Sequence, residues 1–209
     1  MLTNLALIAL GANLSSLAGS PDQSVRFALR LINSHNDLTL GSVSRIYQTP
    51  AYPAGSGPDY ANACATLRTS LTAPALLDVL HSIEAGMGRQ RDGSRWGARG
   101  IDIDLLAMDD QVAPDAAIQD EWRGLAPDRQ QVTAPDRLIL PHPRMQDRAF
   151  VLMPLADIAP QWRHPRTDAS VAEMLAALPA AERAAVRVWL DNPPPTDQVT
   201  GSALSDSNR

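Results

Sequence analysis

The segment "GIDIDLLAM" at residues 100–108 alternates isoleucine with aspartate before it becomes wholly apolar. Successive side chains of a β-strand point to opposite faces, so residues two apart share a face. The pattern predicts a strand that buries its isoleucines and holds Asp102 and Asp104 together on the other side. Two carboxylates this close repel each other unless a cation lies between them. The pair is therefore either a metal site or the solvated face of an edge strand.

The preceding residues 88–100 favour the metal site. They read "GRQRDGSRWGARG" and contain Arg89, Arg91, Arg95 and Arg99. The glycines predict a mobile loop that an anion would order, and arginine offers planar paired donors that suit phosphate oxygens. Trp96 adds a flat face for a base or ring. Mg²⁺ takes one or two carboxylates together with phosphate oxygens, so a metal–triphosphate complex explains both charges. A solvated basic loop explains only the arginines.

Composition excludes several other classes of function. The chain has no lysine, so all 18 of its basic residues are arginine and a phosphate-binding P-loop is excluded. A net charge of −5 argues against a general nucleic-acid coat. Cys64 is the only cysteine, which excludes an internal disulfide and a cysteine-based zinc site and favours the reducing cytoplasm.

The apolar stretch near the N-terminus is expected to be a strand. No basic residue precedes Arg26, so the positive segment of a signal peptide is missing, and the run is too short to span a bilayer. The sequence "SPDQ" at 20–23 has the form of a capping box, and apolar spacing after it predicts a helix. We expect strands at 5–10, 38–49, 60–71 and 100–108, a loop at 49–59, and helices after Pro21 and after Pro74.

The second half of the 209-residue chain is harder to interpret. Residues 109–137 are polar and contain three prolines, so they are expected to form a surface insertion around a short strand or helix. Two turns and a short apolar segment are expected at 140–160, and an amphipathic helix near 168–178. We expect one domain over residues 1–190 and a disordered tail over 191–209. Strands and helices interleave irregularly, which favours an α+β sandwich.

Two further groups of residues are candidates for ligand contacts. His142 lies between two prolines in "LPHPRMQDR", close to Arg144 and Arg148 and downstream of Arg137, which favours a phosphate or ribose contact over a structural role. In "DYANA" at 59–63 a ring and an amide share one strand face. Such a pair can stack on a flat heterocycle and read its edge, although the same two residues could simply border the core.

Five segments in this order resemble the 6-hydroxymethyl-7,8-dihydropterin pyrophosphokinases of folate biosynthesis. They are "ALGANL", "SRIYQTPAY", "DYANA", "GRQRDGSRWGARGIDIDLL" and "LPHPRMQDRAFVLMPL", and the resemblance runs from about Leu5 to about Pro160. It implies a ferredoxin-like α/β sandwich around an antiparallel sheet. It also implies transfer of the pyrophosphoryl group of ATP to the pterin hydroxymethyl group, with release of AMP.

The resemblance also implies roles for individual residues. Asp102 and Asp104 match the acids that hold two Mg²⁺ ions, and Arg89 and Arg99 match arginines of the transfer step. The implied ATP-binding residues are Glu84, Arg91, Trp96, Arg99, Arg137, His142 and Arg148. The implied pterin-binding residues are Gly11, Thr49, Pro50, Tyr52, Tyr60, Asn62, Trp96 and Phe150, with Tyr60 and Phe150 as the two rings of a sandwich. The expected partners are ATP and the pterin, without nucleic acid or membrane, on a monomeric cytoplasmic protein.

Two alternatives remain open from the sequence. A metal-dependent nucleotidyl- or glycosyltransferase also uses two strand acids, but it releases pyrophosphate or a nucleoside diphosphate instead of AMP. A ferredoxin-like RNA-binding module could use exposed arginines with Tyr60 as a stacking platform. Such a module would bind with a steep salt dependence and without Mg²⁺, and the net acidity counts against it.

Overall fold

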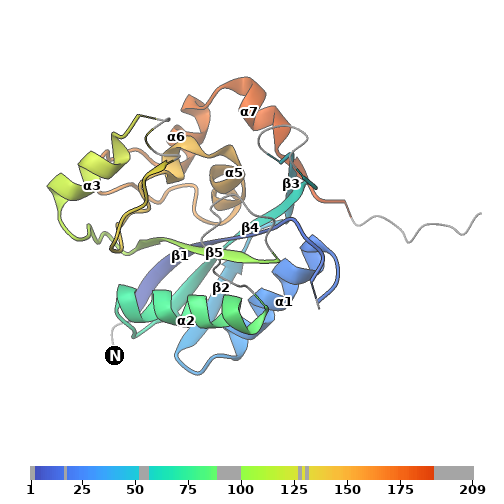
Figure 1. Cartoon of the computed structure of the whole chain (residues 1–209). Coiled ribbons are helices and arrows are strands. Elements are labelled where there is room, and N and C mark those ends of the chain that lie inside the picture. The colour runs from blue at the N-terminus through green and yellow to red at the C-terminus, as the bar shows by residue number, and fades with distance from the viewer. Residues whose placement is uncertain are drawn as a thin grey trace, which may run out of the picture.

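An antiparallel sheet lies between two layers of helices (Figure 1). The computed structural model describes residues 3–16, 18–51, 57–88, 100–126, 129 and 132–190. In this part of the chain the strands are β1 (Asn4–Ala12), β2 (Leu38–Val43), β3 (Tyr47–Thr49), β4 (Tyr60–Thr69), β5 (Asp102–Met108) and β6 (Arg187–Val188). Their order is β5-β1-β4-β3-β6, and β2 pairs with β4 outside this path. The predicted α+β sandwich around an antiparallel sheet is thus confirmed.

The helices cover both faces of the sheet. They are α1 (Pro21–Ser34), α2 (Ala73–Gly86), α3 (Ala116–Arg123), α5 (Ala149–Ile158), α6 (Val171–Ala177) and α7 (Ala180–Ala185), with a 3₁₀ turn at Met145–Asp147. Helices α1 and α2 lie on one face and α5 and α6 on the other (Figure 1). The alternation in β1 serves both cores: Ile8 and Leu10 pack with α1 and α2, whereas Leu7 packs with α5 and α6.

The first two helices begin as the sequence predicts. The side-chain oxygen of Gln23 accepts a hydrogen bond from the backbone N–H of Ser20 at 2.9 Å, which is one half of the capping box. Helix α2 begins after Thr72 and ends before Gly88. Gly88 has a φ of +91°, a backbone conformation that glycine adopts without strain.

The single strand expected at 38–49 is wrong in one respect, because it is divided into β2 and β3. Ser44 lies between the two strands, and its hydrogen bonds to Cys64 of β4 take the place of regular backbone pairing. Its backbone N–H donates to the carbonyl of Cys64 at 2.9 Å, and its hydroxyl accepts from the N–H of Cys64 at 2.9 Å. A side-chain oxygen thus replaces a backbone carbonyl between β2 and β3, which both run antiparallel to β4. Two short elements near the C-terminus, α7 and β6, were not predicted.

A hydrogen-bonded carboxylate at the surface ties α5 to the sheet. Asp157, near the end of α5, accepts hydrogen bonds from the Arg45 guanidinium at 2.6 and 3.0 Å and from the Tyr47 hydroxyl at 3.0 Å. Burial raises the pKa of Asp157, but these donors outweigh burial and hold the pKa below its usual range. The contact orients α5 and therefore its first turn, where Arg148 and Phe150 lie.

Residues 109–137 form a closed excursion that includes α3. Ala113 and Leu140 exchange backbone hydrogen bonds of 2.9 and 3.0 Å, so both ends of the excursion meet. Gln119 is fully buried and its amide donates to the carbonyl of Pro141 at 3.2 Å. Asp120 accepts from the guanidinium of Arg166, which ties α3 to the turn before α6. The expected short element is therefore a helix, and three contacts hold it to the rest of the fold.

His164 makes the stability of this region depend on pH. Its ring is fully buried, and Nδ1 accepts from the backbone N–H of Arg166 at 3.1 Å. Burial, and then the nearby Arg123, lower its pKa to about 4. The unfolded chain binds this proton near pH 6.5, so between pH 6.5 and 4 the unfolded state holds more protons and stability falls as pH falls. We expect the free energy of unfolding to fall by on the order of 1–2 kcal/mol between pH 7 and pH 5.

The measurement is urea unfolding of the unaltered chain and of His164→Asn at both pH values. Asparagine keeps an acceptor for the N–H of Arg166 but does not titrate. The free energy of unfolding of His164→Asn should therefore fall less between pH 7 and pH 5 than that of the unaltered chain, by on the order of 1–2 kcal/mol. His35→Asn, at a partly exposed histidine after α1, is the matched control for the replacement of a histidine by asparagine. Equal pH dependence in the unaltered chain and His164→Asn would contradict the assignment.

Candidate active site

The register of three strands sets the floor of the site. In the antiparallel ladders Gly11 of β1 pairs with Asn62 of β4 and with Asp102 of β5. One step along the same face, Ala9 pairs with Asp104. Directly paired residues point to the same face, so an amide and two carboxylates flank two small residues. The small residues leave room above the sheet between the groups on either side.

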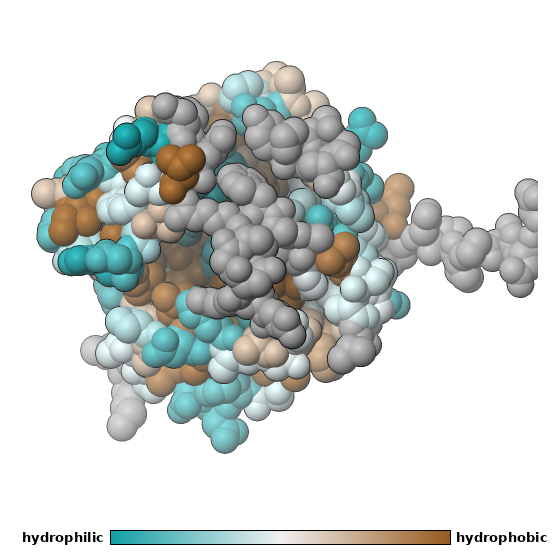
Figure 2. Space-filling view, viewed as in Figure 1, coloured by the Kyte–Doolittle hydropathy of each residue, from teal (hydrophilic) through white to brown (hydrophobic). Residues whose placement is uncertain are grey.

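A pocket of about 750 Å³ lies over this floor. It is open to solvent, and apolar surface lines a hollow left of centre in the face shown in Figure 2. Its wall includes these residues predicted from the sequence: Gly11, Thr49, Pro50, Tyr60, Asn62, Asp102, Asp104, Arg137, His142, Arg148 and Phe150. The structure therefore brings together residues that lie as far apart in sequence as β1 and α5.

One end of the pocket is suited to a flat heterocycle. Asn62 is buried, and its amide nitrogen donates to the hydroxyl of Thr49 at 2.8 Å. This bond orients the amide, and among the described residues its oxygen has no hydrogen-bond partner. A Cβ on Gly11 would come within 3.2 Å of that oxygen, so glycine provides the space the amide needs. Tyr60, two residues before Asn62 on the same strand face, adds an aromatic ring.

The acids face a cation that also contacts an aromatic ring. Arg148 lies 3.9 Å from the carboxylate of Asp104, and its guanidinium lies 5.5 Å from the centre of the Phe150 ring. Phe150 is 39% exposed, which leaves its ring accessible to a ligand. At 3.9 Å the charges attract each other without a tight hydrogen-bonded pair, so each can still bind a ligand of opposite charge.

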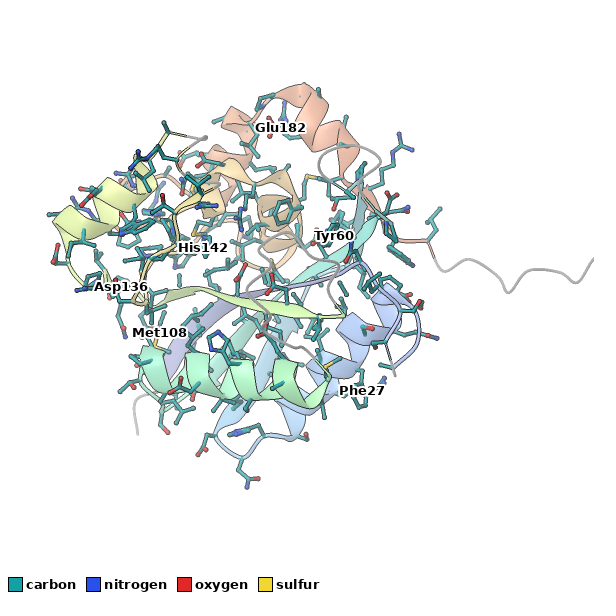
Figure 3. All side chains as sticks on the ribbon, viewed as in Figure 1. Phe27, Tyr60, Met108, Asp136, His142 and Glu182 are labelled. Atoms are coloured by element: carbon teal, nitrogen blue, oxygen red, sulfur yellow. The ribbon has the colours of Figure 1, made fainter. Side chains whose placement is uncertain are left out.

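His142 lies above β5, between Tyr60 and Asp136 in Figure 3. Burial, and then the neighbouring Arg148 and Arg144, lower its pKa to about 3, so the ring is neutral at physiological pH. Nδ1 accepts from the backbone N–H of Arg144 at 3.1 Å, which leaves the proton on Nε2. The ring is therefore a hydrogen-bond donor through Nε2, and not a general base.

Glu84 does not line the pocket, contrary to the sequence-based prediction of a nucleotide contact. It is 1% exposed on α2, and its carboxylate accepts from the backbone N–H of Ile103 at 2.6 Å. Ile103 lies between Asp102 and Asp104, so Glu84 holds the strand segment that carries both acids. The helix face that carries Glu84 packs under β5, which is why the side chain reaches the backbone of the strand.

The acid pair fits a magnesium ion better than a transition metal. Among the described residues, no three His, Cys, Asp or Glu side chains converge on a common point that could hold a metal. Asp102 and Asp104 supply hard oxygen ligands only, and they line an open pocket. An ion with this donor set must complete its shell with water and ligand oxygens, which is the usual behaviour of Mg²⁺ beside phosphates.

Several predicted site residues lie outside the described residues. They are Tyr52, Arg89, Arg91, Trp96 and Arg99, and their roles remain predictions from the sequence. The tail from residue 191 onwards is also outside the described part. Within that part, none of the helices combines the length and the apolar composition that crossing a bilayer requires.

Sequence reasoning missed one wall of the pocket. Trp122 of α3 and residues 133–136 line it, although in the surface insertion expected at 109–137 only Arg137 was predicted to contact a ligand. Leu77 and His81 of α2 also reach it past the edge strand β5. The excursion gave little signal, because nothing in its sequence reveals that its two ends meet. A tryptophan within an otherwise polar segment was the only hint.

Comparison with known proteins agrees with this geometry. A family model described as 7,8-dihydro-6-hydroxymethylpterin-pyrophosphokinase matches residues 7–160. Among proteins named 2-amino-4-hydroxy-6-hydroxymethyldihydropteridine pyrophosphokinase, the chain is 31% identical to that of Bacillus subtilis over 90% of this chain and 92% of that protein. Identity to the Pseudomonas aeruginosa protein is 36% over 82% of this chain and 90% of that protein. The match to the Synechocystis protein is 40% identical but covers 56% of this chain and only 50% of that protein.

Solved structures show the same fold. A Plasmodium falciparum HPPK-DHPS crystal structure with STZ-DHP superposes with a TM-score of 0.59 at 15% identity, over 84% of this chain and 43% of that one. A further HPPK-DHPS structure, in complex with substrates, gives a TM-score of 0.57 at 14% identity, over 83% of this chain and 45% of that one. This chain therefore spans less than half of those longer proteins. From the family match and the two relatives aligned over most of their length, the chain belongs to the 7,8-dihydro-6-hydroxymethylpterin-pyrophosphokinase family.

Proposed function

We propose that this chain transfers the pyrophosphoryl group of ATP to 6-hydroxymethyl-7,8-dihydropterin in folate biosynthesis, and that it does so in the pocket above β1 and β5. The observation that carries the proposal is the placement of two carboxylates between an aromatic–amide end and a cationic wall. Family membership supports the same reaction. We further propose that the enzyme acts as a cytoplasmic monomer.

The pterin is proposed to bind at the Tyr60 end. Its flat ring stacks between Tyr60 and Phe150, and the oriented amide of Asn62 reads its edge, with Gly11 and Thr49 completing the floor. The backbone of Pro50 and Tyr52 completes this end, as the resemblance implies. Stacking fixes the plane of the ring, and the amide fixes its rotation within that plane. The hydroxymethyl group then points towards the acids.

The triphosphate is proposed to lie over β5. Asp102 and Asp104 would hold two Mg²⁺ ions in this proposal, and the bound ions would supply neutralisation of phosphate charge. Arg148 and the Nε2–H of His142 donate to phosphate oxygens from the opposite side. Arg89, Arg91, Arg99, Arg137 and Trp96 complete the ATP site in this proposal. Transfer-step arginines contribute ~10³–10⁵ in rate in other phosphoryl transfers, which is the role we assign to Arg89 and Arg99.

The reaction requires little covalent chemistry from the protein. The pterin hydroxyl oxygen attacks the β-phosphorus, the bond from that phosphorus to the α–β bridging oxygen breaks, and AMP leaves with the electron pair. The hydroxyl proton passes to solvent. The neutral His142 keeps its Nε2 proton throughout and stabilises phosphate charge. Catalysis therefore rests on positioning and electrostatic stabilisation.

Phosphorus NMR tests the proposed reaction directly. ATP, Mg²⁺ and hydroxymethyl-dihydropterin are incubated with the full chain, and AMP and a pterin diphosphate should form together in equal amounts. Release of inorganic pyrophosphate, or of a nucleoside diphosphate, would instead indicate one of the two other transferase classes. Binding of RNA without any turnover would indicate the stacking-platform alternative.

Asp104→Asn removes one negative charge from the proposed metal site and leaves the side-chain size unchanged. We expect kcat for AMP release to fall by about 10²-fold or more, since preorganised electrostatic groups have effects of this size. Binding of the pterin alone should change little, because its contacts lie at the other end of the pocket. The measurements are a coupled AMP-release assay and fluorescence titration with the pterin.

Asp110→Asn is the matched control, because Asp110 is exposed beyond β5 and its loss changes the net charge equally. It should retain full activity. An Asp104→Asn variant with unchanged kcat over a range of Mg²⁺ concentrations would refute the role of the acid pair.

Gly11→Ala tests the pterin end. The added methyl would lie 3.2 Å from the amide oxygen of Asn62, so the amide must move away from its oriented position. We expect Kd for the pterin to rise about fivefold, the size of one weakened hydrogen bond, with Kd for ATP unchanged. Isothermal titration with each ligand measures both values. Gly86→Ala, where a methyl meets nothing within 4 Å, should change neither, and an unaltered pterin Kd in Gly11→Ala would contradict the assignment.

A further inference from the structure

We propose that Trp122, on the insertion helix α3, forms an aromatic wall for the purine base of ATP. Its ring would distinguish a nucleoside triphosphate from a base-free polyphosphate. This inference rests on the proposed function, because it assumes that the triphosphate lies over Asp102 and Asp104. It goes beyond that function by assigning a binding role to helix α3, for which the sequence indicated no ligand contact.

The layout of the pocket leaves one place for the base. Tyr60 marks one end, and Asp136 lies at the opposite side of His142 in Figure 3. The pterin end is defined by Tyr60 and the oriented amide of Asn62, and the charged groups Asp104 and Arg148 lie next to it. A triphosphate held at the charged groups must therefore extend its nucleoside towards the wall formed by Trp122 and residues 133–139.

Contacts at the base of α3 hold Trp122 at the pocket. Gln119 is buried and bonds to the carbonyl of Pro141, the residue before His142. Trp122 is three residues further along the helix and therefore lies on nearly the same face. Asp120 bonds to Arg123 and Arg166, which prevents rotation of the helix about its axis. A ring on a fixed helix loses little further conformational freedom when a ligand binds, which favours affinity.

The chemistry of this wall suits a purine. Leu77, Leu138 and Ile139 line the same pocket as Trp122 and add apolar surface to it. Within the described residues, no hydrogen bond engages the backbone N–H and C=O groups of Leu138 and Ile139, so donors and acceptors are available for the edge of a base. Thr133, whose carbonyl accepts from Arg144 at 3.3 Å, is tied to the same turn as His142. An apolar slot with backbone polar groups at its rim is a common form of base site.

The test compares ATP with inorganic tripolyphosphate, both with Mg²⁺, by isothermal titration of the unaltered chain, Trp122→Ala and Trp122→Phe. Loss of the ring should weaken ATP binding about tenfold, within the range for base–aromatic stacking, and leave tripolyphosphate binding unchanged. Trp122→Phe keeps an aromatic face and should lose no more than about threefold. Thermal unfolding of all three proteins shows whether α3 is retained.

Each outcome decides the inference. A selective loss of ATP affinity in Trp122→Ala, with recovery in Trp122→Phe, supports it. Equal weakening of ATP and tripolyphosphate would show that Trp122 only supports the wall, and unchanged ATP affinity would show that the base lies elsewhere; either result overturns the inference while the proposed function stands. If the unaltered chain binds pterin but not ATP, the proposed function fails and the inference fails with it.

Discussion

The antiparallel pairing of β1 with β4 and β5 decides where the two acids and the amide of the site stand. Asn62, Gly11 and Asp102 form one row across the three strands, and Ala9 and Asp104 belong to the next row on the same face. A slip of one residue in the β1–β5 register would turn both acids towards α2 and the main core. Such a state would bury two unpaired carboxylates, which is too costly to be populated. The hydrophobic pattern that builds the core thus also enforces the geometry of the site.

The parts of the fold with strong local periodicity were predictable. Strands β1, β4 and β5 and helices α1 and α2 each carry an uninterrupted pattern, and their boundaries agree with the sequence to within a few residues. The break between β2 and β3 was not predictable, because it depends on the hydroxyl of Ser44 bonding to the distant Cys64. The two-residue strand β6 depends wholly on its pairing with β3, so it carries no pattern of its own.

The site could be predicted where its residues lie on regular strands. Period-two spacing was enough to place Asp102 beside Asp104, and Tyr60 beside Asn62, on shared faces. The neutral state of His142 follows from surrounding arginines and from a bond to the backbone, which require the folded turn. The wall at Trp122 likewise exists only because the ends of a long excursion meet at Ala113 and Leu140. Contacts between distant segments, and not local propensity, determine these features.

The edge position of β5 explains why Glu84 is buried where a nucleotide contact was expected. An edge strand exposes unpaired N–H and C=O groups, which invite pairing with other chains. Here the carboxylate of Glu84 takes the N–H of Ile103 at 2.6 Å, and the carbonyl of Leu106 accepts from the N–H of His142 at 2.7 Å. These two contacts hold the segment with the acids from its outer side, while β1 holds it from the inner side. Protection of the edge and rigidity of the proposed metal site therefore come from the same pair of bonds, so loss of Glu84 would loosen the acids without removing either of them.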